Sequence, residues 1–488
     1  MARQQTLRAT VDWSYSLLTG AEQLLLRRLS VFPESFDLEA AEAVGGFGDI
    51  GAFGAAGLLG SLVDKSLVVA EPAGGALRYR LLETIRLFAA ERLAQAAGDE
   101  AAAATAAHCA YFLAVAEEAA PHLVGPGQGS WQARLRADHA DLRRAAEHAA
   151  ADPAGTAPVL RFGVALWRFW TDEEAFALLG PVLARPEART DPALFAEALV
   201  VAELAGVWTD PAACRQMGEE AVHLARGLGD DRVLIMALAA LCQTYFFVGE
   251  PGRALALGQE AVERARQLGD DVLLALSLLA YLLVADPAAA GPLCAEAIAC
   301  TERSGDRLFN SSVRGTAGYA ALQAGDIPGA RAHLDASIAA AEAIGAPHLI
   351  ASANLGLVLR AEGNPEGAHP VFGEVLRVSR RRGNTRMMAA AFLGLACVAG
   401  DQGDWHRAGV LHGISRRLLD QTGTPWEEFD ARYCRDSIDQ ARAHLGDAPF
   451  GRAYAQGRGL NLDDAVTLAL QQARPALCGA PGAVGVRR

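Results

Sequence analysis

The sequence predicts an all-α protein: a right-handed helical solenoid preceded by a small helical domain with one β-hairpin. Three observations predict it. Glycine-marked turns recur at spacings of 40, 36, 40, 38 and 40 residues, a second turn lies about half-way between most of them, and a pattern with two strand-like runs precedes the repeats. Two amphipathic helices per period indicate stacked helix pairs. The main turns are Gly229-Asp230, Gly269-Asp270, Gly305-Asp306, Gly345-Ala346, Gly383-Asn384 and Gly423-Thr424.

Small side chains recur inside these repeats. In four units, compact residues are separated by twelve and then by seven positions. The sets are Cys242/Ala254/Ala261, Gly318/Ala330/Ser337, Gly356/Ala368/Val375 and Ala396/Ala408/Ser415. Another unit keeps Ala290 and Ala297 but has Leu278 at the first position. This spacing resembles the tetratricopeptide repeat (TPR), whose paired helices approach closely where side chains are small. Residues 191–424 are therefore predicted to form TPR-like repeats.

A different pattern occupies residues 1–97. Thr19 and Glu22 have the spacing of a capping box, which opens a helix that reaches Leu29. The predicted elements are helices over 6–18, 19–29, 36–44 and 58–65, strands over 66–71 and 77–82, and a helix over 83–97. Helices followed by a hairpin and another helix indicate a winged-helix arrangement.

The remaining segments are helical but less regular. Residues 98–190 are predicted to form a helical bridge, in which Trp167 and Trp170 pack against the first repeat. Residues 425–474 are predicted to form a helical cap, whose last helix starts near Leu462 and is capped by Asn461. The Pro/Gly-rich tail, residues 475–488, is predicted to be disordered.

Several stretches carry a family resemblance. They include TLRATVDWSYSLLTGAEQLLLRRLSVFPESFDLEAAEAV, LLGSLVDKSLVV and RYRLLETIRLFAAERL in residues 1–97, and FGRAYAQGRGLNLDDAVTLAL near the end. They resemble the part that follows the nucleotide-binding domain in actinobacterial signal-transduction ATPases of the STAND class, which have NB-ARC-like motors and accompany SARP-type or LuxR-type regulators. The resemblance covers nearly the whole chain and implies a sensor that controls a nucleotide-binding motor.

The motor itself is absent from this sequence. Lys65 is the only lysine and follows Asp64, so no Gly-x-x-x-x-Gly-Lys-[Ser/Thr] loop that could bind phosphates is present. Where the family has a nucleotide-sensing Met-His-Asp-like motif, this sequence reads Leu81-Leu82-Glu83. No LuxR-type helix-turn-helix follows Ala473. We therefore expect no bound cofactor, and a nucleotide-binding domain, if one participates, acts in cis or in trans.

Bulk composition excludes several function classes. The formal net charge of −13 argues against attraction to bulk nucleic acid or anionic membranes. No apolar run reaches the length of a membrane span, no secretory leader is visible, and the eight cysteines form no paired motif, so a cytoplasmic protein with reduced thiols is expected. Neither metal-ligand spacing nor a nucleophile elbow occurs, so a non-enzymatic protein is predicted.

DNA binding through the winged helix is the main alternative. Residues 1–95 carry nine basic and eleven acidic side chains, and the candidate DNA-reading helix around 58–66 is mostly apolar. A DNA-reading domain normally has a positive surplus on one face. The balance favours packing against a protein domain over contact with DNA.

The inner groove of the solenoid is the predicted partner site, because stacked helix pairs form an extended concave surface. The candidate residues for binding a protein or peptide are Tyr245, Tyr281, Tyr319, Asn354 and Arg360. Three hypotheses result: a regulatory sensor whose repeats bind a partner and whose winged helix relays that event, a DNA-binding transcriptional regulator, and a plain protein-interaction scaffold.

Overall fold

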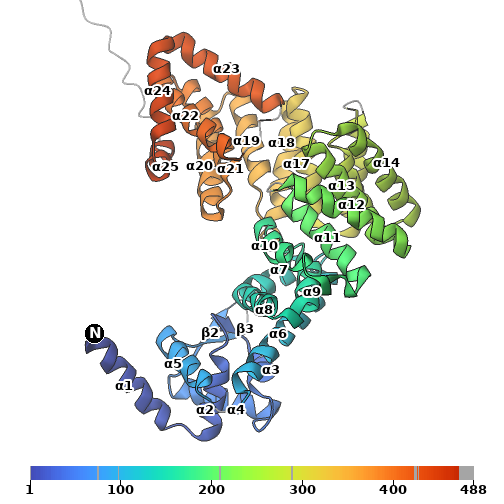
Figure 1. Ribbon diagram of the computed structural model, residues 1–488. Coiled ribbons are helices and arrows are strands. Elements are labelled where there is room, and N and C mark those ends of the chain that lie inside the picture. Colours follow the sequence, from blue (N-terminus) through green and yellow to red (C-terminus); the bar gives the residue numbers. More distant parts are fainter. Residues whose placement is uncertain are drawn as a thin grey trace, which may run out of the picture. The chain divides into compact units, whose positions relative to one another are not determined.

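The computed structural model describes residues 2–73, 76–96, 98–207, 210–286, 289–422, 426 and 428–471. The chain divides into two compact units, residues 1–309 and 310–488, and each is described by itself. The described residues are almost entirely helical, as the sequence predicts, with a single small sheet near the N-terminus (Figure 1). None of the described helices combines the length and the apolar character needed to cross a membrane.

The first unit begins with the predicted winged-helix pattern. Its elements are α1 (Ala2–Ser16), α2 (Gly20–Leu29), β1 (Ser35–Phe36), α3 (Leu38–Gly45), α4 (Ala52–Asp64), β2 (Val69–Ala73), β3 (Ala76–Arg80) and α5 (Glu83–Ala94). The capping box predicted from Thr19 and Glu22 is present: the Thr19 side chain accepts from the Glu22 amide, and the Glu22 carboxylate accepts from the Thr19 amide. This reciprocal pair starts α2 at the expected residue.

The sheet has one strand more than the predicted hairpin. β3 lies in the centre and pairs antiparallel with β2 and with β1, which aligns Ser35 with Arg80 and Phe36 with Tyr79. A two-residue strand has no readable periodicity, so the sequence placed Phe36 in a helix instead. In the structure Phe36 is fully buried and stacks on Phe32, with ring centroids 4.2 Å apart.

Bridge helices follow the winged-helix elements in the first unit (Figure 1). They are α6 (Glu100–Ala119), α7 (Gln128–Ala137), α8 (His139–Ala151), α9 (Thr156–Leu166) and α10 (Asp172–Leu183). One continuous hydrophobic core joins them to the winged helix, with buried members from Leu25 and Phe32 through Phe112 and Leu142 to Trp170. Burial of this apolar surface is the dominant force that holds the two parts together.

Helix pairs then repeat as predicted. The first unit contains α11 (Pro192–Gly206), α12 (Pro211–Leu228), α13 (Asp231–Phe247), α14 (Pro251–Leu268), α15 (Asp271–Tyr281) and α16 (Ala290–Ser304). Gly229, Gly269 and Gly305 end their helices in the left-handed conformation, with φ between 69° and 72°. Asp230 and Asp270 then cap the next helix by accepting hydrogen bonds from its first amides.

The second unit continues the pattern. After α17 (Arg307–Gln323), which spans the boundary between the units, come α18 (Ile327–Glu342), α19 (Leu349–Ala361), α20 (Pro365–Arg382), α21 (Thr385–Asp401) and α22 (Trp405–Thr422). The closing helices are α23 (Glu428–Leu445), α24 (Asp447–Gly459) and α25 (Leu462–Leu470), and Asn461 caps α25 as predicted. The predicted disordered tail, 475–488, lies outside the described residues.

Candidate functional site

The helix that would read DNA in the winged helix is α4. It carries no arginine or lysine, and Lys65 directly after it forms an ion pair with Glu22. Glu22 is buried, and its pKa is lowered to about 2, chiefly by the hydrogen bond from Lys65 and next by that from Ser61. The only lysine of the chain thus has an ion-pair partner within the same domain.

The other cations of the winged helix are engaged as well. Arg28 is buried and donates to the carbonyls of Gly45 and Phe47 at 2.8 and 2.6 Å. The remaining pairs, apart from Arg78, are Arg8–Glu91, Arg27–Glu100, Arg80–Glu71, Arg86–Glu83 and Arg92–Asp12. The side chain of Arg3 lies outside the described residues. Every arginine and lysine whose side chain the structure describes in this domain, including Arg78, therefore has at least one intramolecular partner.

Arg78 fastens the wing to the bridge. From β3 its guanidinium forms an ion pair of 2.7 Å with Asp138 and donates to the carbonyl of Ala137 at 3.1 Å and to the hydroxyl of Ser35 at 2.9 Å. The side chains of Arg78 and Asp138 are only 11% and 5% exposed. Burial raises the pKa of the Asp138 carboxyl, and the guanidinium opposes that rise. These contacts hold β3 against the bridge.

A second buried polar pair lies at the same junction. His108 of α6 and Asp141 of α8 are each 1% exposed, and Nε2 of His108 lies 2.9 Å from Oδ1 of Asp141. Burial, assisted by the Arg144 charge, lowers the pKa of His108 to about 3, and burial, assisted by the Asp138 charge, raises that of Asp141 to about 8. The two groups therefore share one proton near neutral pH and carry no net charge.

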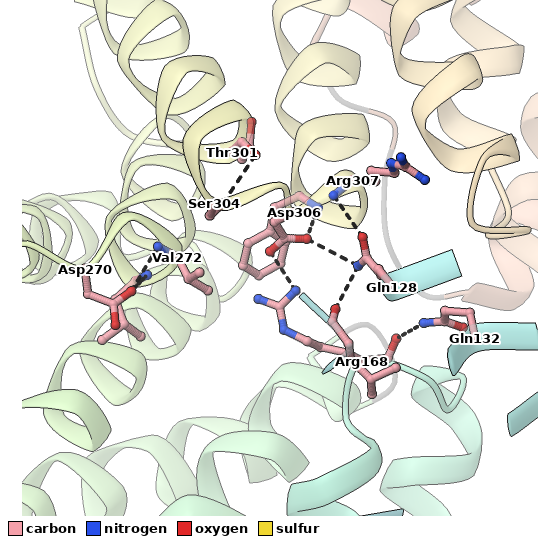
Figure 2. Close-up of polar contacts among 12 residues, drawn as sticks. Gln128, Gln132, Arg168, Asp270, Val272, Thr301, Ser304, Asp306 and Arg307 are labelled. Atoms are coloured by element: carbon pink, nitrogen blue, oxygen red, sulfur yellow. Dashed lines mark hydrogen bonds and ion pairs between the residues drawn. The ribbon is translucent and has the colours of Figure 1, made fainter. Parts of the chain in front are cut away.

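The bridge also meets the repeats through a buried polar cluster, shown in Figure 2. Arg168 lies after α9 and forms an ion pair of 2.7 Å with Asp306, the aspartate of the third Gly-Asp turn. Its guanidinium is 4.6 Å from the ring centre of Trp167 and 4.3 Å from that of Phe309. Asp306 is fully buried, and its Oδ1 also caps α17 at the Phe309 amide.

Gln128 completes this cluster from the first residue of α7. Its Oε1 accepts from the Arg307 amide at 2.9 Å, and its Nε2 donates to the Leu123 carbonyl at 2.8 Å. One turn later, Nε2 of Gln132 donates to the carbonyl of Arg168 at 3.1 Å. Nη2 of Arg168 has no partner among the described residues, so the buried charge is only partly compensated.

The cluster corrects one packing prediction. Trp167 contacts Phe309 at the start of α17, with ring centroids 6.2 Å apart, and Trp170 stacks on Phe162 inside the bridge. The sequence had placed both against the first repeat. The aromatic spacing identified the cluster but not its partner, because the contact joins residues about 140 positions apart in the sequence.

Two of the five predicted partner residues, Tyr245 and Tyr281, lie in the first unit, and Tyr319, Asn354 and Arg360 lie in the second. Tyr245 is buried, and its hydroxyl donates to Glu219 at 2.6 Å and accepts from Arg253 at 3.2 Å. Arg360 forms a two-bond ion pair with Asp401 and lies 5.0 Å from the ring centre of Tyr433. Tyr281 and Tyr319 are half-buried and Asn354 is buried. Tyr245 and Arg360 thus have intramolecular partners, and binding by any of the five stays a prediction.

Two grooves lie between neighbouring repeats. In the second unit, a groove of about 510 Å³ is lined by residues of α18, α19 and α20, among them Leu355, Val371, Val375 and Arg382. In the first unit, a groove of about 350 Å³ is lined by α12, α13 and α14 around Tyr245. Within the described residues, no group of three or more His, Cys, Asp or Glu side chains could hold a metal ion.

Comparisons with known proteins support the winged helix. Residues 18–94 match the family described as a winged helix-turn-helix domain. The "Putative HTH-type transcriptional regulator Rv0890c" of Mycobacterium tuberculosis is 36% identical over 258 residues, which are 49% of this chain and 28% of the regulator. The "Uncharacterized protein Rv0894" of the same organism is 46% identical over 93 residues, 19% of this chain and 24% of that protein. The chain spans less than a third of these relatives.

Solved structures with similar architecture are more distant. A STAND protein with a tetratricopeptide repeat sensor from Pyrococcus horikoshii has a TM-score of 0.40 at 16% identity, covering 88% of this chain and 66% of that one. A Rap protein complexed with competence and sporulation factor has a TM-score of 0.48 at 11% identity, covering 74% and 99%. Both scores lie below 0.5, so these likenesses support no functional conclusion.

Proposed function

We propose that this chain is a regulatory, non-enzymatic protein whose repeats bind a protein or peptide and whose winged helix passes that event to a nucleotide-binding domain, in cis or in trans. The observation that carries the proposal is the occupied state of the winged-helix cations. Arg78 in particular forms an ion pair with Asp138 of the bridge, and its side chain is too buried to be part of a surface that phosphates could reach. These contacts favour a protein over DNA as the partner of this domain.

Exposed apolar side chains of the winged helix support the same conclusion. Trp13 on α1 and Leu17 directly after this helix are 65% and 63% exposed, and Leu87 on α5 is 50% exposed. Exposed apolar side chains that form a contiguous patch are typical of protein interaction surfaces, whereas DNA interfaces are polar and strongly basic. The finer assignment, to the sensor part of a STAND-class regulator of the SARP-associated or LuxR-associated kind, belongs to this proposal.

Site-specific photo-crosslinking in source cells tests the proposal. A photoreactive residue at Leu87 is expected to capture a protein with a nucleotide-binding domain, and one at Tyr281 or Tyr319 a different protein or peptide. The purified nucleotide-binding partner should then change its rate of ATP hydrolysis when the full chain and the second partner are both added. An unchanged rate with both present would contradict the proposal.

A DNA-binding regulator is the second candidate, favoured by the winged-helix match and by the printed name of the mycobacterial relatives. Its test is fluorescence anisotropy of labelled duplex DNA with the full chain. Phosphate contacts make binding rise steeply as salt falls from about 200 to about 50 mM. Binding with that salt dependence, lost on Arg80→Glu, would establish this candidate; no binding at low salt removes it.

A further inference from the structure

Helix α7 connects the repeats with the winged helix. This ten-residue helix is bonded to the repeats at one end and to the wing at the other, and all of these residues belong to the first unit. At its start, Gln128 accepts from the amide of Arg307 in the third Gly-Asp turn. At its end, the carbonyl of Ala137 and the carboxylate of Asp138 bind Arg78 of β3.

Each attachment contains buried side chains, and the bond from Arg78 to the Ala137 carbonyl lies at the surface. Gln128 and Asp306 are 0% exposed, and Asp138 is 4% exposed. Buried polar contacts resist replacement by water, because a group that loses its partner there stays unsatisfied. A displacement at either end must therefore break these bonds or move the helix.

The helix between the attachments is short and well held. Ten residues at 1.5 Å per residue make a rod of about 15 Å. Leu135 is fully buried in the core, Gln132 holds the middle of the helix to the Arg168 carbonyl, and Arg134 lies 3.6 Å from Glu39 of α3. The helix therefore has contacts with the repeat cluster and with two elements of the winged helix.

We propose that α7 is the mechanical link through which a change in the first three repeats reaches the wing. The inference rests on the proposed function for its purpose, since a relay is useful only if the repeats bind something. The mechanical link itself can be tested without a ligand. Weakening the contacts of the Asp306 turn should weaken the contact between Arg78 and Asp138, and weakening the contact between Arg78 and Asp138 should weaken those of the Asp306 turn. Among the described residues, α6 has no comparably direct polar connection between the Asp306 turn and Arg78. The hydrophobic core joins the two regions through apolar contacts only.

Hydrogen–deuterium exchange on the full chain without any ligand tests the link. Asp306→Asn weakens the turn. Gln128→Ala removes the bond from the Arg307 amide, the bond to the Leu123 carbonyl and the 3.5 Å contact with Oδ1 of Asp306, but leaves Arg168 paired with Asp306. Both are expected to speed exchange in β3, Ala76–Arg80, by about tenfold or more, in addition to the local effect. The matched control is Asp270→Asn, which alters the same position of the preceding repeat, whose aspartate has an exposed arginine partner, Arg232. Its effect should stay near Asp270.

The reciprocal experiment starts from the wing. Arg78→Gln is expected to speed exchange of the Arg307 amide, whereas Arg80→Gln, on the same strand but paired with exposed Glu71, is not. Ala133→Gly softens the middle of α7 at an exposed position and should reduce the transmitted effect in both directions. Local changes only, in Asp306→Asn, Gln128→Ala and Arg78→Gln alike, would overturn the link.

This outcome is separable from that of the proposed function. If exchange is transmitted but no partner alters ATP hydrolysis, the link stands and the proposed function fails. If partners act but exchange changes remain local, the function stands and the signal travels by another route.

Discussion

The two ends of the bridge are each held by a buried ion pair, but the surroundings of the two pairs differ. At the winged-helix end, Arg78 meets Asp138 beside a neutral His108–Asp141 pair inside a large aromatic and aliphatic core. At the repeat end, Arg168 meets Asp306 between two aromatic rings, with one guanidinium nitrogen unpartnered. Among the described residues, the first junction leaves Oδ2 of Asp141 without a partner, in a pair that is neutral near pH 7, whereas the second leaves Nη2 of the charged Arg168 without one. The repeat end is therefore the more sensitive of the two to a change of one partner.

Of the substitutions at these two junctions, removal of Arg168 should lower the free energy of unfolding most. Arg168→Ala leaves the fully buried Asp306 carboxylate without its cation, and the expected loss is about 3–5 kcal/mol of unfolding free energy. Urea denaturation followed by tryptophan fluorescence measures it, since Trp167 and Trp170 adjoin the site. Arg232→Ala is the control, because Arg232 is 64% exposed and pairs with the equivalent aspartate, Asp270. A control loss as large as that of Arg168→Ala would mean that burial is not the cause.

Arg78→Ala should come next, with an expected loss of about 2–4 kcal/mol. The variant deprives Asp138 of its ion pair and leaves Ser35 and the Ala137 carbonyl without a donor. The neighbouring Arg80→Ala, in an exposed pair, should leave the denaturation midpoint almost unchanged. Equal midpoints for the two variants would contradict a buried anchor at this end.

Alkaline pH should weaken the winged-helix end selectively. The raised pKa of Asp141 gives stability that is present at low pH and lost as pH rises to about 8, whereas the lowered pKa of His108 costs stability below its usual 6.5. The two trends cancel below pH 6.5, which leaves a loss of about 2 kcal/mol between pH 6.5 and 8. Asp138, Arg78, Glu34 and Asp37 face Asp141, and Arg144 faces His108.

Denaturation at several pH values checks this expectation. The His108→Gln/Asp141→Asn double variant should flatten the dependence over that interval, and a wild-type profile that is already flat would contradict the shared-proton arrangement.

The helix caps provide a smaller effect. Asp270→Ala removes the acceptor for the Val272 and Leu273 amides, at 2.9 and 3.1 Å, and should cost about 1 kcal/mol. Asp306→Ala removes a cap and also strands Arg168 in the interior, so its loss should be clearly larger. Denaturation of the two variants side by side measures the difference, and equal losses would show that Arg168 gains little from Asp306.

Exposed ion pairs between successive repeats should matter least. Arg266 and Glu296 form a two-bond pair across α14 and α16, but their side chains are 50% and 34% exposed. Solvent screening limits such a pair, and Arg266→Ala should change the unfolding free energy by less than about 1 kcal/mol. A larger loss, persisting in high salt, would contradict this screening.

The sequence predicted local features well because their causes are local. The Gly-Asp turns could be located because the glycine ends one helix in the left-handed conformation and the aspartate after it caps the next helix. The same holds for the capping box of α2 and for Asn461 before α25. β1 was not predicted, because two residues of strand are defined by their partner, β3, and not by their own pattern.

Whether the five predicted residues bind a partner stays a prediction, but the structure shows contacts that the sequence did not indicate. Tyr245 and Arg360 were chosen as polar positions on predicted inner helices, but each has found partners from other helices, Glu219 and Arg253 for one and Asp401 for the other. Gln128, Arg168 and Asp138 were not chosen at all. No local pattern marks Gln128 or Asp138, and Arg168 lies inside the aromatic cluster of Trp167 and Trp170 without being singled out. Asp306 stood out only as one member of a repeated turn.

By itself, the sequence determined the helical class, the repeat period, the winged-helix order of elements and the lack of a phosphate-binding loop, since each depends on residues a few positions apart. Only the tertiary structure decided which charges became buried. Asp230, Asp270 and Asp306 occupy equivalent places in the sequence, yet only Asp306 meets Arg168, from 138 positions away, and loses all contact with water. Burial depends on what folds against a residue, and that is not written in its own repeat.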